Sequence, residues 1–219
     1  SRSEFTLQVA DVNNAPVAAL PIGNQFAAQG ALFTYRVPAN AFGDADAKDA
    51  LALLVTRTNG SAIPAWLAFD NASGTLSGTP LNADVGLLEI KVTATDGAGA
   101  IAMQTFDLSI ANVNDSPSAA EVLDDQIAIE NVPVSFGISP NAFADPDAAF
   151  GDALVLSAER ADGAPLPAWL SFDQTSGRFG GTPGRSDQGV YTIKVTATDS
   201  GGLTVSNQFA LAVALPNGL

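Results

Sequence analysis

Aspartate residues in this chain recur at a spacing that suits the coordination of a hard cation. A Phe-x-Asp-x-Asp turn provides Asp44 and Asp46, and the same turn returns with Asp145 and Asp147. The 23 acidic residues comprise 18 Asp and 5 Glu. An acidic surface that served solubility alone would use more Glu, whereas Asp suits turns and is a frequent ligand of Ca²⁺. The aspartate pairs therefore make calcium binding the first chemical hypothesis.

The turns that carry these pairs belong to an internal repeat. Residues Pro64–Pro80 match Pro167–Pro183 at 11 of 17 positions, and the sequence IKVTATD occurs at Ile90–Asp96 and again at Ile193–Asp199, in both cases 103 residues apart. A period near 100 residues is too long for a solenoid unit and fits one small domain. The 219 residues therefore indicate a tandem array of one module.

The repeat sets the expected domain boundaries. We expect one module over residues 14–113 and a second over residues 114–219. Phe5–Asn13 resembles Phe106–Asn114, so residues 1–13 are interpreted as the last strand of a preceding module, with an extra strand of the first module as the alternative. An unpaired strand is a pairing hazard. Phe5–Val12 is therefore expected to pair either with another chain or with a sheet edge of its own chain.

Each module has the pattern of an all-β sandwich. Strand-like runs alternate with turn clusters about 8–12 residues apart, and apolar residues alternate with polar ones within the runs. No segment of useful length shows a helical period with caps. Between the NAF and DAL sequences the second copy carries two extra residues, which marks a surface loop there. The expected strands are 32–37, 51–56, 66–69, 87–95, 101–110, 134–138, 154–158, 169–172, 190–198 and 203–213.

This connectivity should bring three polar elements together. The first residues of a module, the loop after its second strand and the loop before its last strand lie at one end of such a sandwich, which we call the upper pole. Carboxylates gathered there would repel one another unless a cation offset their charge, and Ca²⁺ accepts about six to eight oxygen ligands. The ligands expected at the second upper pole are Asn114, Asp115, Asp145, Asp147 and Asp199. Those expected at the first are Asp11, Asn13, Asn14, Asp44, Asp46 and Asp96.

Turn capping is the alternative interpretation of an aspartate in a loop. We favour it for Asp70 and Asp173, each in an Asp-x-x-Ser-Gly turn. For the poles we favour calcium, because capping does not require three distant segments to bring carboxylates to one place. An EF-hand is excluded, since the twelve-residue loops begun at the first aspartate of each turn end on Val55 and Leu156 where a bidentate Glu is needed.

Composition narrows the possible chemistry further. The chain has no Cys and no His, which excludes disulfides, thiolate zinc sites and His-based nucleophilic catalysis. The net charge of −14 argues against a nucleic-acid partner. No run of about 18 apolar residues is present, so direct membrane insertion is not expected.

Several motifs together resemble those of bacterial putative Ig domains of the dystroglycan-type cadherin-like family. The family pattern has a Phe-x-Asp-x-Asp turn, then LPxWLxF, then Gly-Thr-Pro, then IxVTATDxxG. The corresponding stretches are Phe42–Asp46 and Phe143–Asp147, Pro64–Phe69 and Pro167–Phe172, Gly78–Pro80 and Gly181–Pro183, and the two TATD sequences. The resemblance covers nearly the whole chain and implies two tandem Ig/cadherin-like β-sandwich modules joined end to end.

The joint between modules resembles the cadherin linker Asp-x-Asn-Asp-Asn-x-Pro, at Asn112–Pro117 and Asp11–Pro16. The resemblance implies calcium between modules, completed by the lower pole of the preceding one. The family expects Glu at one such position, which Glu130 satisfies in the second copy, while the first copy has an amide there. The additional ligands expected from the first module and the linker are Gln29, Asp84 and Asn112.

The leading functional hypothesis is a calcium-stabilised structural or adhesion module of a repetitive, secreted or cell-surface bacterial protein, acting as an extender or presenting arm. The alternative is a carbohydrate- or protein-binding module of an extracellular enzyme or adhesin. An enzyme is not expected. Expected partners are neighbouring modules of the array, with self-association or a surface glycan or protein left open. Trp66 and Trp169 are interpreted as core residues, with a sugar-stacking platform as the alternative.

Overall fold

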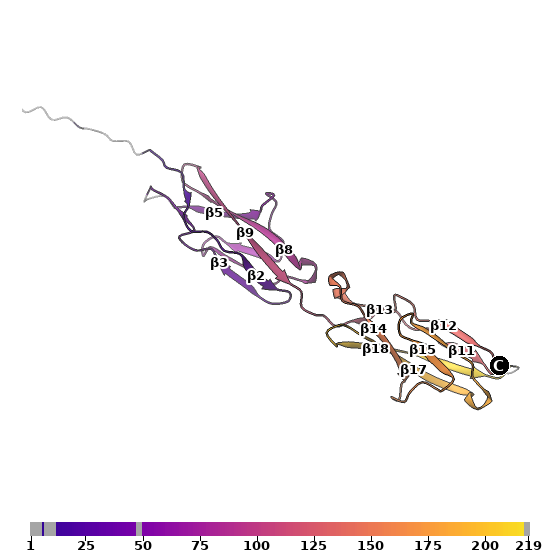
Figure 1. Cartoon of the computed structure of the whole chain (residues 1–219). Coiled ribbons are helices and arrows are strands. Elements are labelled where there is room, and N and C mark those ends of the chain that lie inside the picture. The colour runs from indigo at the N-terminus through magenta and orange to yellow at the C-terminus, as the bar shows by residue number, and fades with distance from the viewer. Residues whose placement is uncertain (1–5, 7–11, 47–49, 217–219) are drawn as a thin grey trace, which may run out of the picture. The chain divides into compact units, whose positions relative to one another are not determined.

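The computed structural model describes residues 6, 12–46 and 50–216. The chain divides between Val113 and Asn114 into two units, called module 1 and module 2 below (Figure 1). The expected all-β architecture of two Ig-like, cadherin-like domains in tandem is confirmed. The expected strand Phe5–Val12 and the candidate ligand Asp11 fall on residues outside this description, apart from Thr6 and Val12.

Module 1 is a sandwich of a four-stranded and a three-stranded sheet. The larger sheet has the order β2 (Gln25–Ala28), β9 (Ile101–Ala111), β8 (Gly86–Thr95), β5 (Ala52–Arg57), with β2 parallel to β9. The smaller has the order β3 (Phe33–Arg36), β7 (Thr75–Gly78), β6 (Leu67–Asp70). A short pair joins β1 (Val17–Ala18) to β4 (Phe42–Gly43), and the 3-10 helix η1 spans Asn82–Asp84.

Module 2 repeats this topology. Its larger sheet has the order β11 (Gln126–Ile129), β18 (Thr204–Ala214), β17 (Gly189–Thr198), β14 (Val155–Arg160). Its smaller sheet has the order β12 (Val134–Gly137), β16 (Arg178–Gly181), β15 (Leu170–Asp173). The short pair is β10 (Ser118–Ala119) with β13 (Phe143–Ala144), and two 3-10 helices occur, η2 (Pro146–Phe150) and η3 (Arg185–Asp187).

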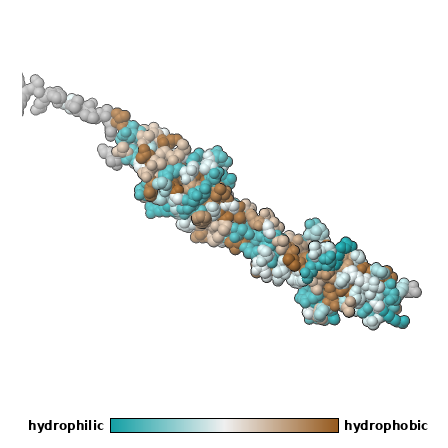
Figure 2. All heavy atoms as spheres, in the orientation of Figure 1, coloured by the Kyte–Doolittle hydropathy of each residue, from teal (hydrophilic) through white to brown (hydrophobic). Residues whose placement is uncertain are grey.

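The core of each module follows from the period-two pattern of its long central strands. In β17, Ile193 and Val195 point inward and are fully buried, while Lys194 between them is on the opposite face and half-buried. In module 2, Phe179 and Phe136 of the three-stranded sheet stack at 5.0 Å, and Phe179 meets Phe209 of the four-stranded sheet edge-on at 5.6 Å. Each buried side chain of this size contributes about 1.5–3 kcal/mol to folding. On the outer surface, hydrophobic residues are interspersed with hydrophilic ones (Figure 2).

Strand β7 is an element that the sequence pattern did not predict. Its residues Thr75–Gly78 follow a turn and lack an alternating apolar pattern, yet β7 is the central strand of its sheet. Leu76 supplies the reason, because it is fully buried between the sheets and holds this short segment in the core. One buried residue thus fixes this strand. Its sequence has no alternation of apolar and polar residues from which a strand could be predicted.

The Gly-Thr-Pro sequences mark a close approach of two backbone segments. A Cβ atom at Gly181 would overlap the carbonyl oxygen of Trp169, and one at Gly78 would overlap that of Trp66. Only glycine permits this spacing. Both tryptophans are half-buried and pack against the core of their module, in agreement with the core interpretation. In the ranges 12–46 and 50–216, no helix has the length and apolar character that a membrane crossing requires.

Candidate metal centre

Three segments that are distant in sequence meet at the upper pole of module 2. The side-chain Nδ2 of Asn114 donates to Asp199 Oδ2 at 3.0 Å, across 85 residues. The backbone N–H of Asp115 donates to Asp147 Oδ2 at 2.6 Å, across 32 residues. The start of the module, the turn after β13 and the loop after β17 are thus held together by the polar groups that the sequence analysis selected.

The turn after β13 is shaped by its own sequence. Asp145 is the N-cap of η2, and its Oδ1 accepts the backbone N–H of Asp147 at 2.7 Å. Pro146 begins the helix, where its missing N–H costs nothing. Gly151 ends it with a φ of 94°, a left-handed conformation that favours glycine. The chain then turns back, and the backbone N–H of Asp152 donates to the carbonyl oxygen of Asp147 at 3.3 Å.

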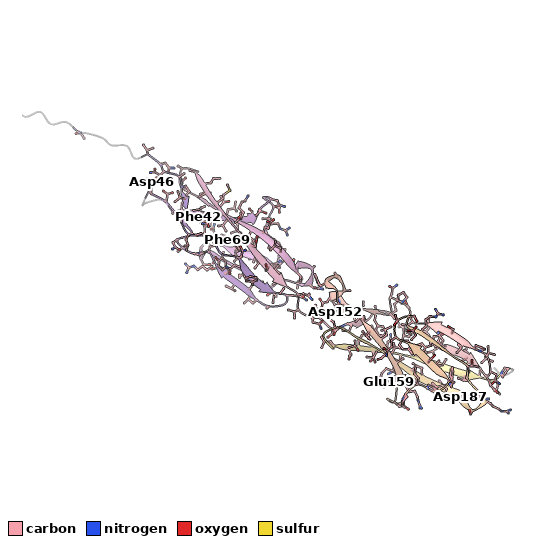
Figure 3. All side chains as sticks on the ribbon, in the orientation of Figure 1. Phe42, Asp46, Phe69, Asp152, Glu159 and Asp187 are labelled. Atoms are coloured by element: carbon pink, nitrogen blue, oxygen red, sulfur yellow. The ribbon has the colours of Figure 1, made fainter. Side chains whose placement is uncertain are left out.

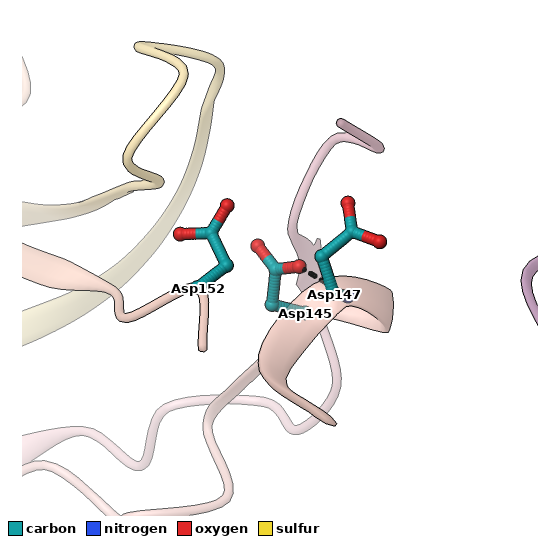
Figure 4. Close-up of side chains that lie close together, drawn as sticks. All are labelled: Asp145, Asp147 and Asp152. Carbon is teal, nitrogen blue, oxygen red and sulfur yellow. Dashed lines mark hydrogen bonds between the residues drawn. The ribbon is translucent and has the colours of Figure 1, made fainter. Parts of the chain in front are cut away.

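The result is a compact group of three carboxylates, Asp145, Asp147 and Asp152. Each offers one oxygen, and these oxygens lie within 4.8 Å of one another (Figure 4). Asp147 is only 1% exposed. Its Oδ1 and the Oδ2 of Asp145 are both buried and have no hydrogen-bond partner in the part of the chain that the structure describes. Buried carboxylate oxygens that lack both hydrogen bonds and a positive charge are costly, and a bound cation would satisfy both needs.

Asp152 is a member of this group that the sequence analysis did not propose as a ligand. Its Oδ1 also accepts the backbone N–H of Ser200 at 2.9 Å, which joins the η2 turn to the loop after β17. A signal was available in the repeat, because the sequence Asp-Ala-Leu begins at Asp49 and again at Asp152, shortly after the aspartate turn. Asp49 lies outside the described residues.

Asp199 occupies the pole but has a different environment from the three grouped carboxylates. It is 5% exposed, and its Oδ1 accepts the N–H of Leu203 at 2.7 Å while its Oδ2 accepts from Asn114. Within the described residues, the close group of three includes neither Asp199 nor Asp115. Asp199 is therefore bonded to Asn114 and to its own loop, while Asp115 contacts the group through its backbone N–H, which donates to Asp147.

Module 1 repeats the arrangement at its own upper pole. Asn13 Nδ2 donates to Asp96 Oδ2 at 3.0 Å, and the N–H of Asn14 donates to Asp46 Oδ2 at 2.6 Å. Asp46 N donates to Asp44 Oδ1 at 2.9 Å, and the other oxygen of Asp44 is buried without a hydrogen-bond partner among the described residues. The Asn13 amide holds the pKa of the Asp96 carboxyl below its ordinary value. Figure 3 labels Asp46 of this pole and Asp152 of the other.

The candidates expected at the lower pole of module 1 take part in local hydrogen bonds. Gln29 Oε1 accepts the N–H of Val113 at 3.3 Å, and Asp84 Oδ2 accepts the N–H of Leu81 at 2.9 Å, which caps η1. Asn112 is exposed in the segment that follows β9. The participation of these three residues in a metal site shared with module 2 stays a prediction.

The Asp-x-x-Ser-Gly turns are capped as the sequence indicated. Asp173 Oδ2 accepts the Ser176 hydroxyl at 2.8 Å, and Asp70 Oδ2 accepts the Ser73 hydroxyl at 2.6 Å. These hydroxyl donors, with the backbone N–H groups of the turns, hold the pKa of both carboxyls below the ordinary value. Turn capping therefore accounts for Asp70 and Asp173 without a metal.

A comparison with family models gives two matches along the chain. The family described as "Putative Ig domain" matches residues 12–111 and residues 116–214. The two matches together cover most of both modules, including the residues of both upper poles from Asn13 onwards except Asn114 and Asp115.

Among curated proteins, the chain is similar to the "Serine-rich adhesin for platelets" of Staphylococcus aureus strain USA300. The two are 27% identical over 169 residues, which is 74% of this chain and 7% of the adhesin. The chain thus spans a small fraction of the length of this relative.

Among solved structures, the chain is similar to cadherin repeats. The human mucin-like protocadherin EC1-2 has a TM-score of 0.61 at 14% identity, over 93% of this chain and 98% of that one. Extracellular cadherin domains 1–5 of protocadherin gamma B2 have a TM-score of 0.56 at 15% identity, over 92% of this chain and 40% of that one. At these identities the likeness concerns the fold alone.

Proposed function

The chain belongs to the Putative Ig domain family as two tandem modules, and on that premise we propose that it is a calcium-stabilised structural or adhesion segment of a secreted or cell-surface bacterial protein. In this role it extends or presents other parts of a repetitive protein. The cadherin-like fold supports the structural part of the proposal, and the similarity to a staphylococcal adhesin supports the surface part. We place the chain in the dystroglycan-type branch of cadherin-like modules on its motifs.

The observation that carries the calcium part is the burial of Asp147. A carboxylate that is 1% exposed, with one oxygen unpartnered among the described residues and two more carboxylates beside it, has a strong electrostatic reason to bind a cation. The candidate metal ligands are all carboxylate, amide or backbone oxygens, the ligand type that Ca²⁺ prefers. The pole contains no His or Cys, which would favour a softer metal. Asp145, Asp147 and Asp152 would hold the ion directly.

The linker residues give the ion its structural effect. Asn114 and Asp115 are already hydrogen-bonded to Asp199 and Asp147, so a cation at the pole would fix the start of module 2 to its loops. Calcium would supply positive charge, and these side chains would supply oxygen atoms and orientation. The aspartate pairs then serve binding, and we assign them no catalytic role.

Isothermal titration of calcium into chelator-treated protein tests the proposal. We expect saturable binding with a Kd of about 10⁻⁴–10⁻³ M, the range of many extracellular modules. Asp147→Asn should weaken binding at module 2. Asp162→Asn, which makes the same chemical change at an exposed turn, should leave it unchanged. A titration that shows no saturable heat up to 10 times that range (about 10 mM) would rule out the calcium part.

A further inference from the structure

Module 2 has a groove beside the free edge of its smaller sheet. The groove has a volume of about 240 Å³ and lies between the end of β12 and the segment of residues 121–126. Phe136 and Phe209 form its floor and meet edge-on at 5.7 Å, and the buried Leu123 closes one wall. The groove therefore combines aromatic rings with a polar lining and is large enough to receive a side chain.

The strand that borders this groove is available for pairing. In the sheet order β12, β16, β15, the strand β12 pairs with β16 and has no second partner strand among the described residues. A sheet edge presents unpaired N–H and C=O groups that an extended peptide can use, with alternate side chains entering pockets beside the edge. Residues Phe136–Ser139 line the groove and continue this edge, so one added strand would reach both features.

The rim of the groove is negative. Glu121 and Asp124 line it and are exposed, Asp125 follows directly, and none of the described residues that line the groove is Lys or Arg. The carboxylates of Glu121 and Asp124 form neither of the two ion pairs found within the described chain. A groove of one charge sign raises the local concentration of a ligand of the opposite sign.

The corresponding surface of module 1 has no acid at any of these three positions. Because β1, β2 and β3 of module 1 correspond to β10, β11 and β12 at an offset of 101 residues, the equivalent positions are known. Module 1 has neutral residues where module 2 has three acids. The pairs are Leu20 and Glu121, Gly23 and Asp124, Asn24 and Asp125, and Arg36 and Gly137. The arginine beside this edge changes strand between the copies, since Arg36 of β3 pairs with Thr75, whereas Gly137 of β12 pairs with Arg178. The acidic rim is therefore specific to module 2, while one arginine lies beside the corresponding strand in each copy.

We propose that this groove is a binding site for an extended basic segment of a partner protein. The segment adds as a strand to β12, places an apolar side chain over Phe136 and Phe209, and directs Lys or Arg side chains to Glu121 and Asp124. Charge complementarity selects the partner, and the aromatic floor selects its apolar residue. This interaction surface is separate from the acidic upper pole and does not depend on calcium.

Fluorescence anisotropy with short labelled peptides tests the proposal on the whole chain in the presence of a chelator. The probes are acetyl-KLKLK-amide, its acidic counterpart ELELE and its apolar-free counterpart KSKSK. We expect binding of KLKLK that weakens with added salt, weaker binding of KSKSK and none of ELELE. Hydrogen exchange of the amides in β12 should slow when KLKLK is bound.

Two variants locate the effect. E121L/D124G gives module 2 the residues of module 1 and should weaken KLKLK binding by about threefold to tenfold, as expected for two rim charges. E159Q/D162N is the control. It removes two charges in and just after β14, the edge strand of the larger sheet that lies opposite β11, and should change the affinity by less than about twofold. The reciprocal variant L20E/G23D/R36G should create KLKLK binding in module 1.

The proposal is overturned if E121L/D124G and E159Q/D162N weaken binding equally, because the attraction would then be a property of net charge. It is also overturned if KSKSK binds as tightly as KLKLK or if β12 gains no protection. Self-association of the chain alone that E121L/D124G abolishes would assign the groove to a second copy instead.

Discussion

The backbone N–H of Asp115 and the carboxylate of Asp147 meet at 2.6 Å, which fastens the first residues of module 2 to the turn that holds its acidic group. The equivalent contact in module 1 joins Asn14 to Asp46 at the same distance. Because the linker and the candidate metal centre share this carboxylate, a change at one affects the other.

Asp152→Asn should weaken calcium binding at module 2 without unfolding the pole. The substitution removes one of three grouped negative charges, while an amide oxygen can still accept the N–H of Ser200. We expect a loss of affinity of about tenfold, which corresponds to about 1.4 kcal/mol. Calcium titration of this variant beside Asp162→Asn measures it. Equal affinities of the two variants would remove Asp152 from the site.

Gly181→Ala should be among the most destabilising single changes in module 2. Its Cβ would collide with the carbonyl oxygen of Trp169, so the backbone must shift, at a cost of about 3 kcal/mol or more. Gly180→Ala is the matched control on the same strand, because a Cβ there meets nothing closer than 3.9 Å and module 1 has Ser77 at the equivalent position. Urea unfolding of the two variants would contradict this account if both lost the same free energy.

Asp173→Asn should lower stability equally with calcium and with chelator, because Asp173 caps a turn. Since the Ser176 hydroxyl holds the folded pKa of Asp173 below its unfolded value of about 3.9, its contribution is fully present above that value. The contribution disappears as pH falls through the lower, folded pKa. Urea unfolding at pH 7 and at about pH 2.5 should therefore show a difference between wild type and variant at pH 7 that shrinks in acid. A difference that grew in acid would refute the assignment.

Calcium should also narrow the range of arrangements that the two modules sample. The linker Asn112–Pro117 is short and contains a proline, so it has little slack, and an ion held by its residues would stiffen it further. Small-angle scattering with calcium and with chelator tests this prediction. Identical profiles would show that calcium does not stiffen the linker. Calcium binding at the pole of module 2 is tested separately, by the titration and thermal unfolding of Asp147→Asn.

Much of this architecture could be predicted from the sequence because the repeat and the alternating strands carry strong patterns. The convergence at the poles also followed, since the strand order decides which loops share an end. Strand β7 was missed because one buried residue, Leu76, holds it in place without a period. Asp152 was missed because its position depends on the reversal at Gly151, a backbone conformation that the spacing of acids does not reveal.

The most direct test of the calcium centre is thermal unfolding of wild type and Asp147→Asn, each with calcium and with chelator. At free calcium about ten times Kd, binding should stabilise wild-type module 2 by about 1.4 kcal/mol and raise its Tm by several degrees. Asp147→Asn should lose most of this rise and should be at least as stable as wild type in chelator, because it removes a buried charge from beside Asp145 and Asp152. If Asp147→Asn instead destabilises the chelated protein and keeps the full calcium response, the acidic group is a turn network and the metal assignment is wrong.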